Sequence, residues 1–222
     1  MKYCFFAKTV WDLFENGYKK QLKIILGEGR TKKILKLAKP KYREIIESID
    51  ELDGSQFTFK IFSSAALVSI LLNMSKYDPS KISELYCSVM NNKFMHKAAK
   101  FANAYTQKKR ELLKSQAKKS EMNSNPYSFL YEVKDDENFR KYSIIVKSCG
   151  VCHLMKKYNL EEYTQAVCAF DFLFAKMSDT DLTRNCSLAD GDLYCDYNFN
   201  YMGKLKDRKI KKLEAIKNTN DN

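Results

Sequence analysis

Apolar side chains recur at steps of three and four residues through much of the first half of the chain, which is the spacing of one face of an α-helix. We predict a first helix over residues 6–27, whose apolar stripe consists of Val10, Phe14, Tyr18, Leu22 and Ile25. Residues 31–39 continue with helical character. Pro40 fits an early position of the next helix, which we expect to end at Asp53-Gly54.

The next segments predict three more helices. Residues 61–74 are apolar nearly all round, which indicates a helix that is buried on every side. Asp78-Pro79-Ser80 interrupts the chain, and residues 81–90 then resume a helical pattern. We predict a long basic helix over residues 93–118, with an apolar side that carries Phe94, Ala98, Phe101, Tyr105 and Leu112.

The hydrophobic period changes from helical to alternating beyond residues 120–126, a polar segment that ends in Asn-Pro. The alternation predicts strands over residues 127–133 and 139–146, joined as an antiparallel hairpin around a turn at residues 135–138. Helices are then predicted over residues 149–158 and 161–175. Asn159 lies between these two helices and is the predicted cap of the second one.

A second hairpin is predicted near the end of the chain, because Asp190-Gly191 is a strong signal for a tight turn. With these two residues as the loop, the facing pairs are Leu188 with Leu193, Cys186 with Cys195, and Arg184 with Tyr197. In residues 182–188 the alternation places Arg184 on the apolar face of the strand.

These elements predict an α+β fold in which a helical N-terminal half packs on a small antiparallel sheet of about four strands with two inserted helices. A chain of 222 residues fits one domain. We predict a single domain over residues 1–202, with a helical layer at 1–119 and a sheet- and site-bearing part at 127–202. Residues 203–222 are predicted to form a basic tail that is partly disordered.

The net charge of +12 is compatible with nucleic-acid binding, but the lysines are scattered along helical segments and no recognised nucleic-acid motif is present. We therefore expect a lysine-rich solvated surface and no nucleic-acid partner. The longest apolar run, at residues 65–72, is far shorter than the roughly 20 residues that span a membrane. The N-terminus also lacks the pattern of a signal peptide, so we predict a cytoplasmic protein.

Seven cysteines, an odd number, suit a reducing compartment better than a framework of disulfides. Five of the seven lie between residue 149 and the C-terminus, which makes this part of the chain the expected place for chemistry. Free cysteine is most often a small buried hydrophobe, and inert thiols are the alternative interpretation.

Arg184 is the most informative charged residue of this region, because a guanidinium rarely faces a core without an anion to meet it. A bound substrate carboxylate would supply that anion. The alternatives are a buried pair with Asp171 or Asp196, or a strand at the sheet edge.

The run Cys149-Gly150-Val151-Cys152-His153 spells the attachment pattern of c-type haem. Its CxxC pair would also suit a metal or a dithiol that cycles between reduced and oxidised forms. Haem attachment normally needs export, and a tetrahedral zinc would need two more ligands, for example from His153, Cys168, Cys186 and Cys195.

Five short motifs follow one another in the C-terminal third, at residues 147–152, 160–164, 167–171, 182–191 and 194–199. Their order and spacing resemble the L-2-amino-thiazoline-4-carboxylic acid hydrolase family. Members of this family carry a Cys near the end of a strand, a Cys three residues before an Asp, an Arg before a Leu-Ala-x-Gly turn, and a Cys-Asp-aromatic-x-Phe strand. The chain departs from the family's Gly-rich turn, because Asp192 and Leu193 follow a single Gly191.

The resemblance implies a hydrolase that opens a cyclic isothiourea in a small carboxylate, such as 2-amino-thiazoline-4-carboxylate, and yields N-carbamoyl cysteine. The residues assigned to catalysis are Cys149, Asp171 and Cys195, with one of the two cysteines as the nucleophile. Those assigned to substrate binding are Arg184, as a carboxylate clamp, together with Asp196 and Cys168. Cys168 shares a helix face with Asp171, whereas strand alternation points Asp196 away from Cys195.

The expected partner is therefore a small-molecule carboxylate, with no cofactor and no bound metal. A non-catalytic ligand-binding module, similar to the small-ligand sensor domains that resemble 4-vinyl reductase, is the alternative. A metal protein with cysteine ligands is a third hypothesis.

Overall fold

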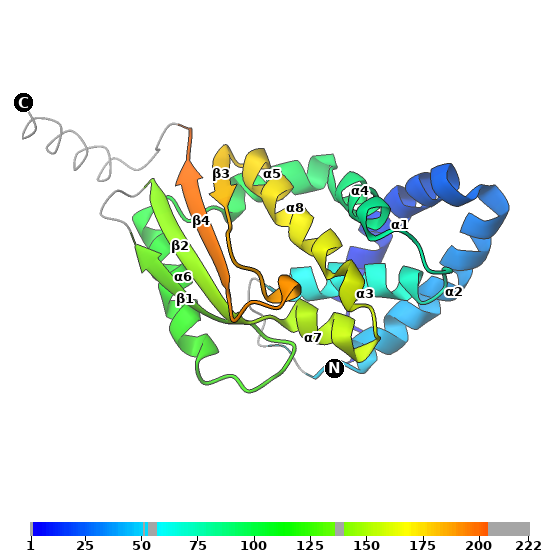
Figure 1. The fold of residues 1–222 in the computed structure, drawn as a ribbon, viewed down its shortest axis with the longest axis horizontal. Coiled ribbons are helices and arrows are strands. Elements are labelled where there is room, and N and C mark those ends of the chain that lie inside the picture. The colour runs from blue at the N-terminus through cyan, green and yellow to red at the C-terminus, as the bar shows by residue number, and fades with distance from the viewer. Residues whose placement is uncertain (1, 51, 53–56, 136–139, 204–222) are drawn as a thin grey trace, which may run out of the picture. The chain divides into compact units, whose positions relative to one another are not determined.

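A computed structural model describes residues 2–50, 52, 57–135 and 140–203, and within them it contains eight α-helices and one sheet of four strands (Figure 1). The predicted α+β class is confirmed. The helices are α1 Phe5–Leu26, α2 Glu28–Glu47, α3 Thr58–Leu71, α4 Pro79–Met90, α5 Lys93–Ala102, α6 Gln107–Ser120, α7 Gly150–Lys157 and α8 Thr164–Met177. The strands are β1 Leu130–Asp135, β2 Lys141–Ser148, β3 Thr180–Thr183 and β4 Cys195–Tyr201.

The chain forms two compact units whose segments alternate along the sequence. The first unit consists of Met1–Lys93, Ser124–Phe129 and Cys149–Asp171, and the second of Phe94–Asn123, Leu130–Ser148 and the described part of Phe172–Asn222. The single domain over residues 1–202 stays a prediction. Residues 204–222, which include nearly all of the predicted basic tail, lie outside the described residues.

The core of the first unit centres on α3, in which every residue from Ile61 to Leu71 is buried. α1, α2 and α7 all contact α3. The predicted stripe of α1 is buried as expected, apart from the partly exposed Ile25. Two tyrosine hydroxyls in this core have partners: that of Tyr42 donates to the Ala7 carbonyl at 2.9 Å, and that of Tyr86 donates to Ser63 Oγ at 3.2 Å.

Pro40 lies inside α2, so the prediction of a new helix near this residue is wrong. One continuous helix runs from Glu28 to Glu47. Proline has no N–H, which leaves the carbonyl of Lys36 without its helical donor. Lys36 and Pro40 are both exposed, so water can bind this carbonyl and the helix tolerates the proline. The predicted end at Asp53-Gly54 lies outside the described residues.

The predicted long basic helix over residues 93–118 is also wrong, because α5 and α6 are separate helices. Between them the Tyr105 ring stacks on Tyr201 at a centroid distance of 4.6 Å and meets the edge of Tyr142 at 5.4 Å. Thr106 then caps α6, with its Oγ1 accepting from the Lys109 amide at 3.4 Å. The aromatic contacts and the cap together end one helix and begin the next.

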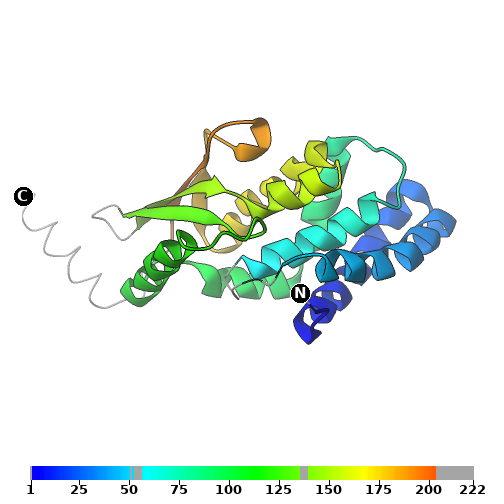
Figure 2. The same cartoon turned by 90° about the horizontal axis from the view of Figure 1, so that it is seen from below.

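The four strands lie in the order β1-β2-β4-β3, and every neighbouring pair is antiparallel. The predicted first hairpin is confirmed, although its strands begin two or three residues later than expected, and residues 136–139 of its turn are not described. Helices α7 and α8 follow β2 and precede β3, as the sequence predicted. α6 contacts β1 within the second unit (Figure 2).

Two predictions of local geometry are wrong. Asn159 does not cap α8; it adopts a left-handed conformation (φ 53°) after α7, and α8 begins only at Thr164. The last hairpin also lacks a two-residue loop, because residues 184–194 leave the ladder and include a short 3-10 helix at Leu188–Asp190. The part of the ladder that forms has the predicted offset, since Leu182 pairs with Phe199 and Thr183 with Asn198. The predicted pairs of Leu188 with Leu193 and Cys186 with Cys195 are not part of the ladder.

Gly150 provides a test of close backbone packing at the start of α7. A Cβ atom at this position would lie 1.9 Å from the Tyr127 carbonyl oxygen and 2.9 Å from Ile61 Cδ1. We expect Gly150→Ala to lower the free energy of unfolding by at least about 2 kcal/mol, because a backbone carbonyl cannot move aside as a flexible side chain can. Urea denaturation measures the change.

Gly29→Ala is the matched control, since nothing lies within 4 Å of a Cβ atom there. Alanine should raise stability at this helical position by about 0.5–1 kcal/mol. Equal effects of the two substitutions would contradict the close contact at Gly150.

Candidate functional site

A partly buried ion pair joins α3 to α8 in the first unit. Lys60 Nζ lies 2.7 Å from Asp171 Oδ1 and 2.8 Å from Oδ2, and the two side chains are 22% and 19% exposed. Lys60 stands in the first turn of an otherwise apolar helix, and its charge is compensated by a carboxylate from α8. The pair places a positive charge beside two thiols, those of Cys149 and Cys168.

Cys149 immediately precedes α7, and its pKa depends on this setting. A hydrogen bond from the Cys152 thiol, the positive charge of Lys60 and the amides of Val151 and Cys152 stabilise the Cys149 thiolate. Burial opposes these effects, but the pKa of Cys149 is still lowered to about 7. A substantial fraction of this thiol is therefore in its nucleophilic form near neutral pH.

Lys60 keeps its positive charge over the whole physiological range. Burial alone would lower its pKa, but the negative charges of Asp171, Cys168 and Cys149 overcome burial and raise the pKa of Lys60 well above its ordinary value. Cys168 lies one helical turn before Asp171 on α8 and is buried, as expected from their spacing. Lys60 is thus a fixed cation between a carboxylate and thiols.

Arg184 belongs to a different group of residues, in the second unit. Its guanidinium carbon lies 5.4 Å from the ring centre of Phe172 and 5.5 Å from that of Tyr197, and its Nη1 donates to the Tyr197 hydroxyl at 3.4 Å. The predicted position opposite Tyr197 on an apolar face agrees with these contacts. Aromatic rings on two sides hold the guanidinium in place.

Asp196 and Cys195 organise the loop that follows β3. Asp196 Oδ1 accepts from the amides of Asn185 at 2.8 Å and Cys186 at 2.6 Å. Partial burial raises the pKa of Asp196, but these amides outweigh burial and the pKa falls below its ordinary value. The buried Sγ of Cys195 accepts from the Leu188 amide at 3.3 Å. Both side chains have backbone partners in the loop.

The structure therefore divides the predicted site residues into two groups. Cys149, Cys168 and Asp171 surround Lys60 in the first unit, and Arg184, Cys195 and Asp196 belong to the second unit. Lys60 was missed by the sequence analysis. Its signal in the sequence is a single charge in an otherwise uncharged and mostly buried helix, a placement that needs a partner of opposite charge.

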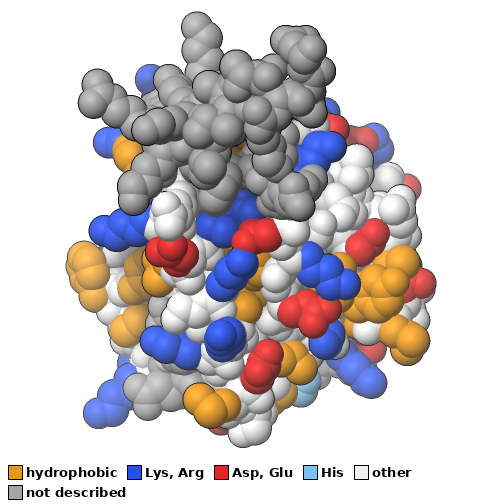
Figure 3. Space-filling model, turned by 90° about the vertical axis from the view of Figure 1, so that its left-hand side faces the viewer, with side chains coloured by type: hydrophobic (Ala, Val, Ile, Leu, Met, Phe, Trp, Pro, Cys, Tyr) orange, Lys and Arg blue, Asp and Glu red, His pale blue; other side chains and the backbone are white. Residues whose placement is uncertain are grey.

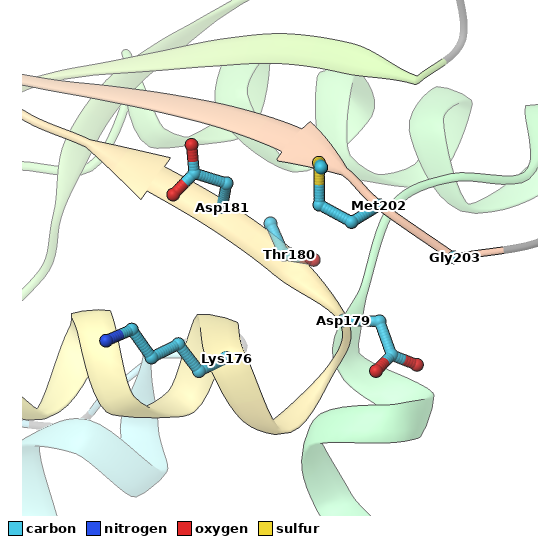
Figure 4. A pocket seen from close by; sticks show the side chains of 6 residues that line it. All are labelled: Lys176, Asp179, Thr180, Asp181, Met202 and Gly203. Atoms are coloured by element: carbon cyan, nitrogen blue, oxygen red, sulfur yellow. The ribbon is translucent and has the colours of Figure 1, made fainter.

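An open hollow in the second unit is lined by none of the predicted site residues. Figure 4 shows Lys176 on α8 and Asp181 on β3 at this hollow, which is also lined by Asp179, Thr180, Met202 and Gly203. The hollow contains no thiol and gives no candidate nucleophile.

The described residues lack the features of two other classes of site. In residues 2–50, 52, 57–135 and 140–203, no three or more His, Cys, Asp or Glu side chains are grouped so that they could hold a metal ion. No helix in this part of the chain is long and apolar enough to cross a membrane. On the face seen in Figure 3, Lys and Arg side chains are interspersed with Asp and Glu.

An α+β fold that carries a low-pKa thiol beside a fixed cation has the features of a cysteine-nucleophile site. A family model described as L-2-amino-thiazoline-4-carboxylic acid hydrolase matches residues 58–199, which is more than half of the chain. The chain belongs to this family, and the matched residues include both groups of candidate site residues. No curated protein and no solved structure matches the chain.

The electrostatic role of Lys60 can be tested by the pH dependence of Cys149 alkylation. We expect the rate of labelling by iodoacetamide, followed by mass spectrometry, to rise with a midpoint near pH 7. Lys60→Met should move this midpoint to higher pH, because the thiolate loses a neighbouring positive charge.

Lys76→Met is the matched control, since Lys76 is exposed and pairs with Glu162 instead. Circular dichroism of each variant verifies that it is folded. An unchanged midpoint in folded Lys60→Met would show that Lys60 does not stabilise the thiolate.

Proposed function

We propose that this protein is a hydrolase that opens the ring of a small cyclic isothiourea carboxylate, with 2-amino-thiazoline-4-carboxylate as the representative substrate. N-carbamoyl cysteine is the product. The observation that carries the proposal is the Cys149 thiol with a pKa of about 7, beside the cation of Lys60. Membership of the hydrolase family supports the reaction class.

The first step uses Cys149 as the nucleophile. Its thiolate attacks the ring carbon between sulfur and nitrogen, and the ring nitrogen takes one proton. The bond between this carbon and the ring sulfur breaks, and the sulfur leaves as a thiolate. The opened substrate is then attached to Cys149 as a protonated S-linked isothiourea (an isothiouronium cation).

The second step releases the product with one molecule of water. Water adds to the same carbon, the bond to the Cys149 sulfur breaks, and the carbon becomes the carbonyl of a urea. Two protons are released, of which one replaces the proton taken in the first step and the other protonates the product thiolate. Cys149 returns to its thiolate form.

Lys60 and Asp171 act on the nucleophile through charge. The raised pKa of Lys60 makes it a poor proton donor, so its role is to stabilise the thiolate of Cys149. Both carboxylate oxygens of Asp171 accept from Lys60, which favours orientation of the ammonium over action as a general base. Asp171 is thus a positioning residue in this mechanism.

Cys195 was the other candidate nucleophile. Its buried sulfur accepts from the Leu188 amide, and its neighbour Asp196 accepts from two loop amides. These contacts favour a role in holding the loop. The assignments of Asp196 and Cys168 to substrate binding stay predictions.

The proposal is tested with Cys149→Ser and 2-amino-thiazoline-4-carboxylate as the substrate. We expect kcat to fall at least about a thousandfold, since serine is a far weaker nucleophile at neutral pH. Cys87→Ser, which removes another half-buried thiol of the first unit, should retain turnover.

The other outcomes are decisive as well. Full turnover in Cys149→Ser would exclude Cys149 as the nucleophile. Loss of turnover in Cys195→Ser alone would favour Cys195. Binding of the substrate without any turnover by the unmodified protein would instead support the non-catalytic ligand-binding module.

Arg184 is tested separately as the predicted carboxylate clamp. Charge-assisted hydrogen bonds contribute about 1.5–3 kcal/mol, so Arg184→Ala should raise KM by about 10- to 100-fold. Steady-state kinetics measure the change, with the thermal melting curve as the control for folding. An unchanged KM in folded Arg184→Ala would rule out the clamp.

A further inference from the structure

Cys149 and Cys152 stand at the two ends of the first turn of α7. Cys149 is the residue that precedes the helix, and Cys152 is its third residue. Positions three apart at a helix start bring their side chains to the same side. The hydrogen bond from the Cys152 thiol to Cys149 places the two sulfurs next to each other.

The proposed hydrolysis uses only one of these thiols as a reactive group. Cys152 has no covalent role in the mechanism, although its thiol is hydrogen-bonded to the nucleophile. Both cysteines are partly exposed, whereas Cys168 on α8 is buried. The role of the Cys152 thiol is therefore not explained by the proposed hydrolysis.

We propose that Cys149 and Cys152 form a redox-active dithiol. When hydrogen peroxide oxidises Cys149, the two cysteines form a disulfide within the first turn of α7. This inference does not depend on hydrolysis, because it requires only the two thiols and a peroxide.

The oxidation proceeds in two balanced steps. The Cys149 thiolate attacks one oxygen of hydrogen peroxide, the O–O bond breaks, and Cys149 sulfenic acid and hydroxide form. The Cys152 sulfur then attacks the sulfenic sulfur, the S–O bond breaks, and the disulfide and one water form. Cys149 and Cys152 together lose two electrons, and the peroxide gains them.

Local geometry favours this pair over a link between Cys149 and Cys168. Disulfides need their Cβ atoms about 3.5–4.5 Å apart. Positions three apart on a helix have Cβ atoms about 5–6 Å apart, so a local movement within this one turn closes the bond. The backbone of this turn lies close to the segment that contains Tyr127, since Gly150 packs against the Tyr127 carbonyl. The thiol of Cys168 senses the same cation, Lys60, but it comes from another helix.

Closure of the disulfide consumes the proposed nucleophile. The oxidised protein would therefore lose hydrolase activity and regain it on reduction. This consequence rests on the proposed function, whereas formation of the disulfide does not.

The full-length chain is treated with hydrogen peroxide, its remaining thiols are blocked with iodoacetamide, and the protein is digested with trypsin. Cleavage after Lys147 and Lys156 releases both cysteines in one peptide, residues 148–156. We expect this peptide to lose two hydrogens and to remain unalkylated, and dithiothreitol should reverse both changes.

Two variants identify the partner. Cys168→Ser should form the same internal disulfide, because Cys168 takes no part in it. Cys152→Ser should instead accumulate Cys149 sulfenic acid, which dimedone traps.

Three results would overturn the proposal: an unmodified peptide after peroxide, a peptide oxidised only to sulfinic or sulfonic acid, or a link from Cys149 to another cysteine. Because the readout is a mass, it separates the two proposals. A disulfide in a protein without turnover leaves the redox site standing and removes the hydrolase. Turnover that survives disulfide formation contradicts Cys149 as the nucleophile.

Discussion

The ion pair between Lys60 and Asp171 is the constraint on which the candidate chemistry depends. An ammonium in a helix that is otherwise buried is unfavourable without a partner, and breaking a fully buried pair costs about 3–5 kcal/mol. The cost here is smaller, because both side chains retain about a fifth of their exposure. Once Asp171 has fixed the charge of Lys60, that charge is available to the thiols around it. The pair thus links the packing of α3 and α8 to the state of Cys149.

Local periodicity was sufficient for most of the fold. The stripe of α1 and the uniformly apolar α3 follow from spacing alone, and so does the register of β3 with β4. The errors arose where a distant or solvent partner decides the structure. Tyr105 fits a helical stripe, but its ring packs against the rings of Tyr142 and Tyr201, which are distant in the sequence. Pro40 would end a buried helix, but here it lies on an exposed face, where water can bind the Lys36 carbonyl that lacks a helical donor.

The candidate site was predictable only in part, for a related reason. The spacing of Cys168 and Asp171 on one helix face is local, and the sequence shows it directly. The partner of Asp171 is more than a hundred residues away, so no spacing rule leads to Lys60. The CxxC pattern was visible, but its meaning depended on the cation beside it. The hydrogen bonds from the loop amides of Asn185 and Cys186 to the Asp196 carboxylate likewise form only after the chain has folded.

The contact of Gly150 with the Tyr127 carbonyl affects which residues around Cys149 can be replaced without moving Cys149. Main-chain atoms on both sides fix the distance between the start of α7 and the segment that contains Tyr127. The three heavy atoms nearest to a Cβ at Gly150 are two main-chain atoms of Tyr127 and Cδ1 of Ile61. Replacement of residues elsewhere around the thiols can therefore alter which ligand fits without displacing Cys149. The lining of the site can thus change while the sulfur of Cys149 keeps its place.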